Sequence, residues 1–205
     1  MKISVALAAY NGEKYIGEQI ESILPQLGWD DEIVVSDDNP AGKTRAAVEF
    51  YSAYDGRVRY VEGTGEGVCR NFENAILNCS GDVIFLCDQD DVWLPNKVER
   101  VMKAIENGAD VVLHDAMMTD GELNVTDESF FSLNGSKKGF VRNFLKNSYM
   151  GCCMAFRRDF EPAFMPFPKD LAMHDWWIGL NAELKGKVEF IYEPLIKHRC
   201  HGGNV

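Results

Sequence analysis

The strongest constraint on the fold is the alternation of short apolar segments with helical ones, starting at residue 3. Residues 3–8 and 82–87 are mainly apolar, which is typical of parallel strands covered on both faces. After the first of them, Ile16, Ile20 and Ile23 form the single apolar stripe of a helix that packs on a core. The pattern predicts an α/β fold with a mostly parallel central sheet flanked by helices.

The remaining elements follow from the same two patterns. We predict further strands at residues 32–36, 57–61, 110–113, 152–157 and 188–192, and further helices at residues 44–54, 68–76, 96–106, 140–145 and 175–184. Residues 114–137 are expected to form loops and short strands. Neither a repeat nor a linker interrupts the sequence, so we expect a single domain over residues 1–205, with halves at about 1–113 and 114–205.

The charge of the chain narrows the class of partner. The formal net charge is −11, which argues against DNA or RNA because that binding depends on clustered Lys and Arg. An acidic protein that binds a phosphorylated small molecule needs a local cation between the two. We therefore expect no nucleic-acid partner, and a metal ion if the ligand carries phosphate.

The cysteines and the apolar segments indicate the compartment. The six cysteines show no CxxC spacing, so we expect reduced thiols and no zinc site. The N-terminal residues lead directly into a predicted strand, and we expect no signal peptide. No apolar segment approaches the roughly 20 residues that span a bilayer. We expect a cytoplasmic protein, with docking at the inner face of the membrane left open.

Acidic side chains follow two of the predicted strands. Asp37 and Asp38 end one strand, and Asp88, Asp90 and Asp91 follow another. The carboxyl ends of parallel strands lie at one edge of the sheet, where ligands of such folds bind. Clustered carboxylates repel one another unless a cation lies between them, and oxygen ligands favour Mg²⁺ or Mn²⁺. For Asp91 alone, a role at the N-terminus of the next helix is equally compatible with the sequence.

Six short motifs together resemble one family. They are Ala9-Tyr10-Asn11-Gly12, Ser36-Asp37-Asp38, Gly67-Val68-Cys69-Arg70-Asn71-Phe72, Phe85-Leu86-Cys87-Asp88-Gln89-Asp90-Asp91-Val92-Trp93, His174-Asp175-Trp176-Trp177 and His201-Gly202-Gly203-Asn204-Val205. In this order and spacing they resemble glycosyltransferase family 2, whose members have the GT-A fold, and in particular its bacterial rhamnosyltransferase-like members. The resemblance extends over nearly the whole chain. It implies a GT-A nucleotide-diphospho-sugar transferase fold, with residues 1–113 as the nucleotide-sugar-binding half and residues 114–205 as the acceptor-side half.

The resemblance also implies roles for individual residues. Asp88-Gln89-Asp90 matches the DxD motif of the family, and Asp90, Asp88 and His201 are the expected ligands of Mn²⁺ or Mg²⁺. For His201, the alternative is a surface histidine in a loose terminus. The expected nucleotide-sugar-binding residues are Ala9, Tyr10, Asn11, Asp37, Asp38, Arg70, Asn71, Asp88 and Gln89.

Asp175 matches the acidic residue that acts as general base in the family. The resemblance implies an inverting transfer, in which this carboxylate takes the proton of an acceptor hydroxyl as that oxygen attacks the anomeric carbon. The alternative is that Asp175 caps the following helix. The implied donor is a UDP- or dTDP-sugar, and the implied acceptor is a saccharide or a lipid-linked molecule in bacterial polysaccharide or glycolipid assembly.

The sequence departs from the family pattern in two places. The acidic pair is followed by Asn39-Pro40 instead of the Ser or Thr and further Asp that the family often has, which affects the expected contacts to base and ribose. The chain also ends four residues after His201, where many family members continue.

Three other function classes use related sequence features. The glycines at 63, 65 and 67 do not match a dinucleotide-binding pattern, because Val68 stands where the third glycine belongs and the segment does not follow the first strand. A nucleotidyltransferase that makes nucleotide-sugars, and a binding module without catalytic activity, remain as alternatives. The presence of Asp175 argues against the module.

Overall fold

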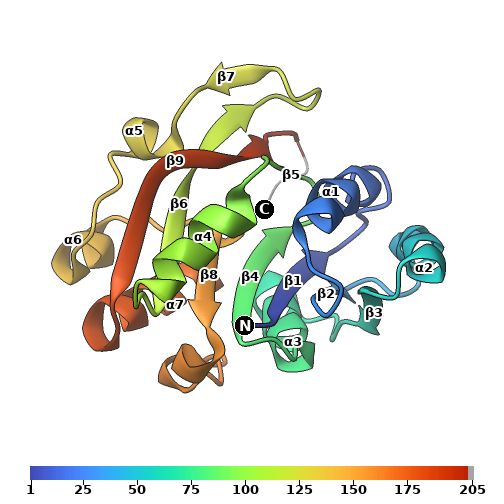
Figure 1. Ribbon diagram of the computed structural model, residues 1–205, viewed down its shortest axis with the longest axis horizontal. Coiled ribbons are helices and arrows are strands. Elements are labelled where there is room, and N and C mark those ends of the chain that lie inside the picture. Colours follow the sequence, from blue (N-terminus) through green and yellow to red (C-terminus); the bar gives the residue numbers. More distant parts are fainter. Residues whose placement is uncertain (203–205) are drawn as a thin grey trace.

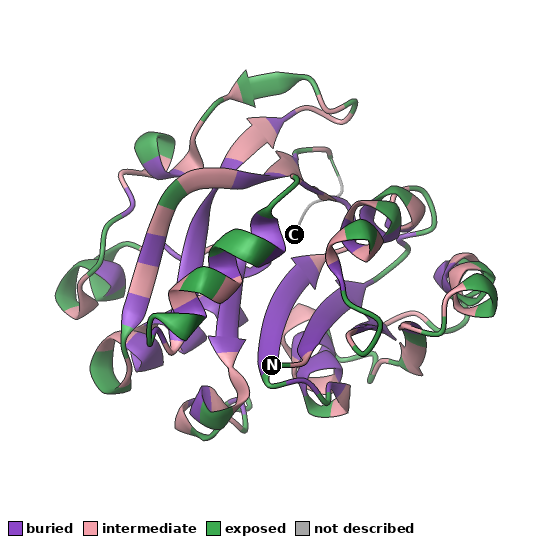
Figure 2. Ribbon diagram, viewed as in Figure 1, coloured by how far each residue is buried: buried purple, intermediate pink, exposed green. Residues whose placement is uncertain are grey.

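The first strand shows how the chain builds its core. A computed structural model describes residues 1–202. In it, β1 (Ile3–Ala9) is buried along its whole length, as are β2 (Glu32–Asp37) and most of β4 (Val83–Asp88). A strand buried on both faces needs helices on both sides of its sheet. The continuous apolar segments of the sequence are therefore central strands, and the prediction of an α/β fold is confirmed (Figures 1 and 2).

The sheet joins the two halves of the chain. Its strand order is β3-β2-β1-β4-β8-β6-β9-β5, with β7 paired to β6. The strands from β3 to β4 are parallel, β8 is antiparallel to both of its neighbours, and β6 and β9 are parallel to each other. The remaining strands are β3 (Val58–Glu62), β5 (Val92–Trp93), β6 (Val111–Thr119), β7 (Val125–Asp127), β8 (Met154–Arg157) and β9 (Val188–Arg199).

The helices lie on the sheet through their apolar faces. The α-helices are α1 (Ile16–Ile23), α2 (Thr44–Tyr54), α3 (Val68–Asn78), α4 (Lys97–Glu106), α5 (Phe130–Asn134), α6 (Phe140–Leu145) and α7 (His174–Lys185). Helix α4 crosses β6, β8 and β9, and α3 packs on β1 and β2 (Figure 1). Among residues 1–202, no helix has the length and apolar character needed to cross a membrane.

The second half of the chain departs most from the sequence prediction. The strand expected at residues 110–113 runs on to Thr119, and the one expected at 188–192 continues to Arg199. The extension of β9 is stabilised by pairing with β6 and with β5. Because β9 is longer than predicted, it carries His198 and the residues after it to the end of β4.

Candidate active site

The carboxyl ends of three strands meet at one point, as the acidic residues predicted. In the sheet register, Ala9 of β1 lies opposite Asp37 of β2, and Ala8 lies opposite Asp88 of β4. A cavity of about 610 Å³ opens beyond these strand ends. Its walls include the turn after β1, Asp38 after β2, the glycine loop before α3, the acidic segment after β4, residues 150–151 with the start of α7, and His198 of β9.

The turn after β1 is tied to the acidic segment by Gln89. The Tyr10 backbone N–H donates to the Gln89 side-chain oxygen at 2.9 Å, and the Gln89 amide donates back to the Tyr10 carbonyl at 3.0 Å. A side chain at Gly12 would collide with this amide, since a Cβ there would lie 2.0 Å from Gln89 Oε1. The Tyr10 side chain is left exposed at the cavity rim.

Asp38 holds the glycine loop in place. Its two carboxylate oxygens accept hydrogen bonds from the backbone N–H groups of Gly65 at 2.7 Å and Gly67 at 2.8 Å. Both glycines have positive φ, 71° and 91°, a conformation that other residues rarely adopt. The glycine loop is thus held by the Asp38 carboxylate. Asp38, Gly65 and Gly67 all line the cavity.

Asp37 and Asn11 support the same edge from outside the cavity. Asp37 is fully buried, and its carboxylate accepts hydrogen bonds from the Asn39 backbone N–H and the Tyr60 hydroxyl, both at 3.1 Å. Burial raises the pKa of Asp37. Asn11 has a φ of 51° and accepts a hydrogen bond from the Asn39 side chain at 2.8 Å. Of the acidic pair, only Asp38 lines the cavity.

Arg70 and Asn71 face different ways at the start of α3. The Arg70 guanidinium forms an ion pair with Glu73 and donates to the carbonyl oxygens of Phe167 and Pro168, at 3.2 and 2.7 Å. These partners hold it to the loop before α7, and it does not line the cavity. Asn71 does line the cavity, and its amide donates to the Ala9 carbonyl at 2.9 Å.

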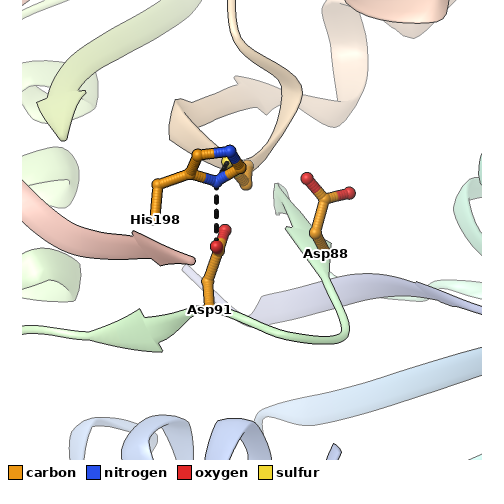
Figure 3. Close-up of side chains that lie close together, drawn as sticks. Asp88, Asp91 and His198 are labelled. Carbon is orange, nitrogen blue, oxygen red and sulfur yellow. Dashed lines mark hydrogen bonds and ion pairs between the residues drawn. The ribbon is translucent and has the colours of Figure 1, made fainter. Parts of the chain in front are cut away.

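The acidic segment after β4 is paired with two histidines from the end of the chain. The Asp91 carboxylate lies 2.9 Å from His198 Nδ1, and the Asp90 carboxylate lies 2.8 Å from His201 Nε2 (Figure 3 shows the Asp91–His198 pair beside Asp88). His201 also stacks on the Tyr15 ring, so it is not loose at the surface. Gly203, Asn204 and Val205 of the last motif lie outside the described residues.

Asp91 is not a helix cap. Helix α4 has Asn96 at its N-cap position, whereas Asp91 is almost fully buried and bonded to His198. One of its oxygens, Oδ2, is buried and has no hydrogen-bond partner among the described residues. A buried oxygen without a partner is costly, so this position favours a further donor or a cation.

Crowding of negative charge perturbs the titration of this cluster. Burial, followed by repulsion from Asp91 and Asp90, raises the pKa of Asp88 to about 7. Burial also opposes the charged form of His198, but attraction to the Asp91 carboxylate outweighs it and raises the pKa of His198 to about 10. The cluster therefore holds more carboxylates than its two imidazoles can balance.

The donor atoms here fit a divalent cation. Ligand atoms of Asp88, Asp91, Cys152 and His198 all lie within 4.8 Å of one another. The expected ligands Asp88 and Asp90 lie on the cavity wall, and the third expected ligand, His201, is bonded to Asp90. His198 and Cys152 were not expected from the sequence. The sequence near them gives no signal for this meeting, because His198 reaches the acidic segment through the pairing of β9 with β6 and β5.

Asp175 lines the same cavity from a different element. It lies in the first turn of α7, where Met173 is the N-cap residue, so Asp175 is not itself the cap. Burial raises the pKa of Asp175 to about 6, although hydrogen bonds from the Trp176 and Gly151 backbones oppose that shift. Asp175 is only 7% exposed, and it lines the cavity. A carboxylate with this pKa can accept a proton near neutral pH, and Asp175 lies where a ligand in the cavity could reach it.

His174 forms the floor next to this carboxylate. Its ring stacks on Phe72 with centroids 4.0 Å apart, and burial lowers the pKa of His174 to about 3. A Cβ at Gly151 would lie 2.7 Å from His174 Nε2, so glycine is needed for the close approach of this loop. His174 is therefore a neutral packing residue at neutral pH.

Comparison with known proteins identifies the family. The family described as Glycosyl transferase family 2 matches residues 4–162. The chain belongs to this family. It is 27% identical over 217 residues to an uncharacterized glycosyltransferase of Nostoc sp., covering all of this chain and 66% of that protein. It is 26% identical over 215 residues to the dTDP-rhamnosyl transferase RfbG of Shigella flexneri, covering 97% of this chain and 72% of that protein.

Solved structures with the same fold agree with this assignment. Residues 1–349 of TarS of S. aureus, in complex with UDP, match with a TM-score of 0.77 at 19% identity, over 98% of this chain and 61% of that one. The mannosyltransferase PcManGT of Pyrobaculum calidifontis, in complex with GDP-Man and Mn²⁺, matches with a TM-score of 0.69 at 17% identity, over 94% of this chain and 54% of that one. The expected GT-A fold is confirmed. The chain spans 54–72% of the length of these matched chains.

Proposed function

We propose that this family member is a metal-dependent glycosyltransferase that moves a sugar from a nucleoside diphosphate to an acceptor hydroxyl with inversion. The observation that carries the proposal is the arrangement of carboxylates around one cavity. Asp88 and Asp90 line the cavity beyond β4, and Asp175 lines the same cavity from the start of α7. This arrangement separates a site for the diphosphate from a base for the acceptor.

The donor would lie against the first half of the chain, residues 1–113, which we assign as the nucleotide-sugar-binding part. The turn at Tyr10, the loop held by Asp38, and Asn71 surround that side of the cavity. Backbone N–H groups and small glycines suit a flat base and a ribose. The donor we propose is a UDP- or dTDP-sugar, in keeping with the UDP complex of TarS and with RfbG as a dTDP-rhamnosyl transferase.

Asp88, Asp90 and His201 would hold Mn²⁺ or Mg²⁺. Oxygen-rich donor sets favour these ions, and the pKa of Asp88 is raised by burial and by repulsion from Asp91 and Asp90, a repulsion that a cation would relieve. When bound, the cation would stabilise the negative charge of the departing diphosphate. PcManGT, whose fold is similar, was solved with GDP-Man and Mn²⁺.

Asp175 would take the acceptor proton. The acceptor oxygen forms its bond to the anomeric carbon while the bond from that carbon to the diphosphate breaks, and the hydroxyl proton passes to the Asp175 carboxylate. With a pKa of about 6 this carboxylate is ionised at neutral pH and yet more basic than an exposed aspartate. Neutral His174 leaves that proton to Asp175 and shapes the floor of the cavity.

The acceptor would enter from residues 114–205, the acceptor-side half. We propose a saccharide or lipid-linked acceptor, used in bacterial polysaccharide or glycolipid assembly at the cytoplasmic face of the membrane. The relative RfbG, a dTDP-rhamnosyl transferase, supports a sugar-transfer role of this kind.

The test is a thermal-shift panel of nucleotide-sugars with and without Mn²⁺. A ligand that binds the native state raises its stability by mass action. The proposal predicts a stabilising shift with UDP- or dTDP-sugars that disappears when EDTA is added. Product analysis then separates the rivals. A nucleotidyltransferase would instead turn a sugar phosphate and a nucleoside triphosphate into a nucleotide-sugar and pyrophosphate, and a binding module would leave the donor intact.

A further inference from the structure

Residues 130–147 form a basic segment in an acidic protein. They contain Lys137, Lys138, Arg142 and Lys146 and no acidic residue, whereas the chain as a whole has a net charge of −11. A net of +4 within −11 leaves −15 for the rest of the chain. Such a strong local reversal of charge marks a surface that meets a negatively charged partner.

Helix α6, within this segment, exposes its apolar side chains instead of burying them. Val141, Phe144 and Leu145 are 72%, 58% and 79% exposed, while the polar Asn143 is fully buried. Leu133 of α5 is likewise exposed. Helices α5 and α6 lie at the same edge of the molecule (Figures 1 and 2), and Lys146 after α6 donates to the Asn134 carbonyl of α5. We call these four apolar residues with Lys137, Arg142 and Lys146 the α5–α6 surface. Exposed apolar side chains gathered in this way on a folded protein mark an interaction site.

The orientation of α6 is fixed by hydrogen bonds from its buried side. The Asn143 side chain donates to the carbonyls of Lys137 and Gly139, at 2.9 and 3.0 Å. The Gly139 backbone N–H donates to Glu183 of α7 at 2.7 Å, and the Trp176 indole donates to the Asn143 carbonyl at 2.6 Å. These bonds attach α6 to α7 and leave its apolar face directed outward.

The basic side chains keep most of their charge available. Arg142 and Lys146 donate to backbone carbonyls, of Gly135 and Asn134 respectively, which satisfies hydrogen bonds without neutralising charge. Lys138 forms an exposed ion pair with Glu189, and such pairs contribute little and are easily exchanged for another anion. The surface therefore combines aromatic and aliphatic side chains with positive charge.

We propose that the α5–α6 surface docks on a membrane that contains anionic phospholipids. Apolar side chains that enter the interface, flanked by Lys and Arg that meet lipid phosphates, are the two components of reversible interfacial binding. A second copy of the chain fits less well, because a symmetric interface would bring two patches of the same charge together.

The location of the surface gives docking a consequence for catalysis. Trp176, which bonds to α6, directly follows Asp175 in α7. A membrane bound at α5 and α6 therefore lies on the acceptor side of the cavity. This consequence rests on the proposed function, in which Asp175 activates the acceptor, and it favours a lipid-linked acceptor over a free saccharide.

Vesicle flotation tests the docking without donor, metal or turnover. The chain is mixed with neutral phosphatidylcholine vesicles or with vesicles containing 30% phosphatidylglycerol, at low and at high salt. We expect flotation with the anionic vesicles only, and release by salt. Lys137→Gln/Arg142→Gln should weaken binding roughly fivefold for each charge removed, so about 25-fold in total. Phe144→Ser/Leu145→Ser should weaken it by a factor of at least ten.

The molecule offers a matched control for the apolar variant. Phe50 and Tyr54 of α2 are 59% and 80% exposed, nearly the same as Phe144 and Leu145, but they lie outside the basic segment. Phe50→Ser/Tyr54→Ser should float like wild type, and all variants should keep the wild-type melting temperature. Equal flotation with neutral and anionic vesicles, an equal loss in the α2 control, or a dimer in wild type that the α6 variants abolish would each overturn the proposal. Failure of donor binding in the thermal-shift panel would leave it intact.

Discussion

Replacing Asp175 by asparagine should change activity and stability in opposite directions. The substitution keeps the size of the side chain and one oxygen that can accept from the Trp176 backbone, but it removes the negative charge. If Asp175 is the general base, turnover should fall by about two to four orders of magnitude, the span typical of a lost base. The donor KM should stay within about threefold, because the missing interaction belongs to the transition state.

The stability change follows from the burial of the carboxylate. The pKa of Asp175 rises from 3.8 to about 6, so the folded state retains a proton that the unfolded state releases between these values. As pH rises through this window, the wild type loses about 3 kcal/mol, at 1.36 kcal/mol per pH unit. Asparagine avoids this loss but forfeits hydrogen bonds from Gly151 and Asn147, each worth about 1 kcal/mol.

The net effect at pH 7 should therefore lie between zero and about +2 kcal/mol, a rise in Tm of up to about 6 °C for a chain of this size. The advantage of Asp175→Asn should shrink toward pH 4, and wild-type activity should rise with pH through about 6. Differential scanning fluorimetry from pH 4 to 8 measures the Tm difference and its change with pH, and steady-state kinetics over the same range measures the pH dependence of activity. A variant that melts several degrees lower at pH 7 and keeps its activity would refute the reasoning.

Asp115→Asn serves as the matched control. Asp115 is also a buried aspartate, but it accepts hydrogen bonds from the backbones of Ala116 and Phe131 and from the Ser129 hydroxyl, and it does not line the cavity. The substitution should lower Tm at neutral pH and leave the turnover of the folded protein close to wild type. This pattern is the reverse of that expected for Asp175→Asn.

Three further results are expected. Asp90→Ala should weaken UDP binding at least tenfold in the presence of Mn²⁺, and EDTA should make wild type equal to the variant; calorimetry showing no metal effect in wild type would contradict the assignment of Asp90. UDP and dTDP should differ in affinity by about tenfold, or roughly 1.4 kcal/mol, because Asp37 is engaged by Asn39 and Tyr60 outside the cavity. A preference of several orders of magnitude would show that a side chain contacts the base directly and discriminates uracil from thymine. Arg70→Ala should lower Tm by several degrees through loss of its bonds to Glu73 and the loop before α7 while donor Kd stays within threefold, and a tenfold loss of affinity at unchanged Tm would place Arg70 at the diphosphate.

The first half of the fold, residues 1–113, could be predicted because its signals are local. Each apolar segment there is a central strand, and each helix has one apolar stripe, so helix α2 was predicted with its observed bounds, Thr44–Tyr54. The meeting of Asp37 and Asp88 on either side of β1 followed from the parallel order of these strands. Strand-end carboxylates are thus placed by topology alone.

The rest depends on contacts between distant segments. The end of β9 contains Glu193, Lys197 and His198, and its strand conformation comes from pairing with β6 and β5, not from an alternating pattern. That pairing brings His198 to Asp91, which no local signal near either residue indicates. Arg70 shows the same limit, since the sequence indicates a cation near the site but not the carbonyls of residues 167 and 168 that engage it.

The most direct test of the central claim is the anomeric configuration of the first product. An α-linked UDP- or dTDP-sugar that stabilises the chain in the thermal-shift panel is incubated with enzyme and Mn²⁺, with water or a sugar as acceptor, and followed by proton NMR from the earliest times. Metal-dependent inverting transfer predicts that the β-anomer forms first, that EDTA abolishes its formation, and that Asp175→Asn forms it at least a hundredfold more slowly. Formation of the α-anomer first, or an equal rate in EDTA, would contradict the account.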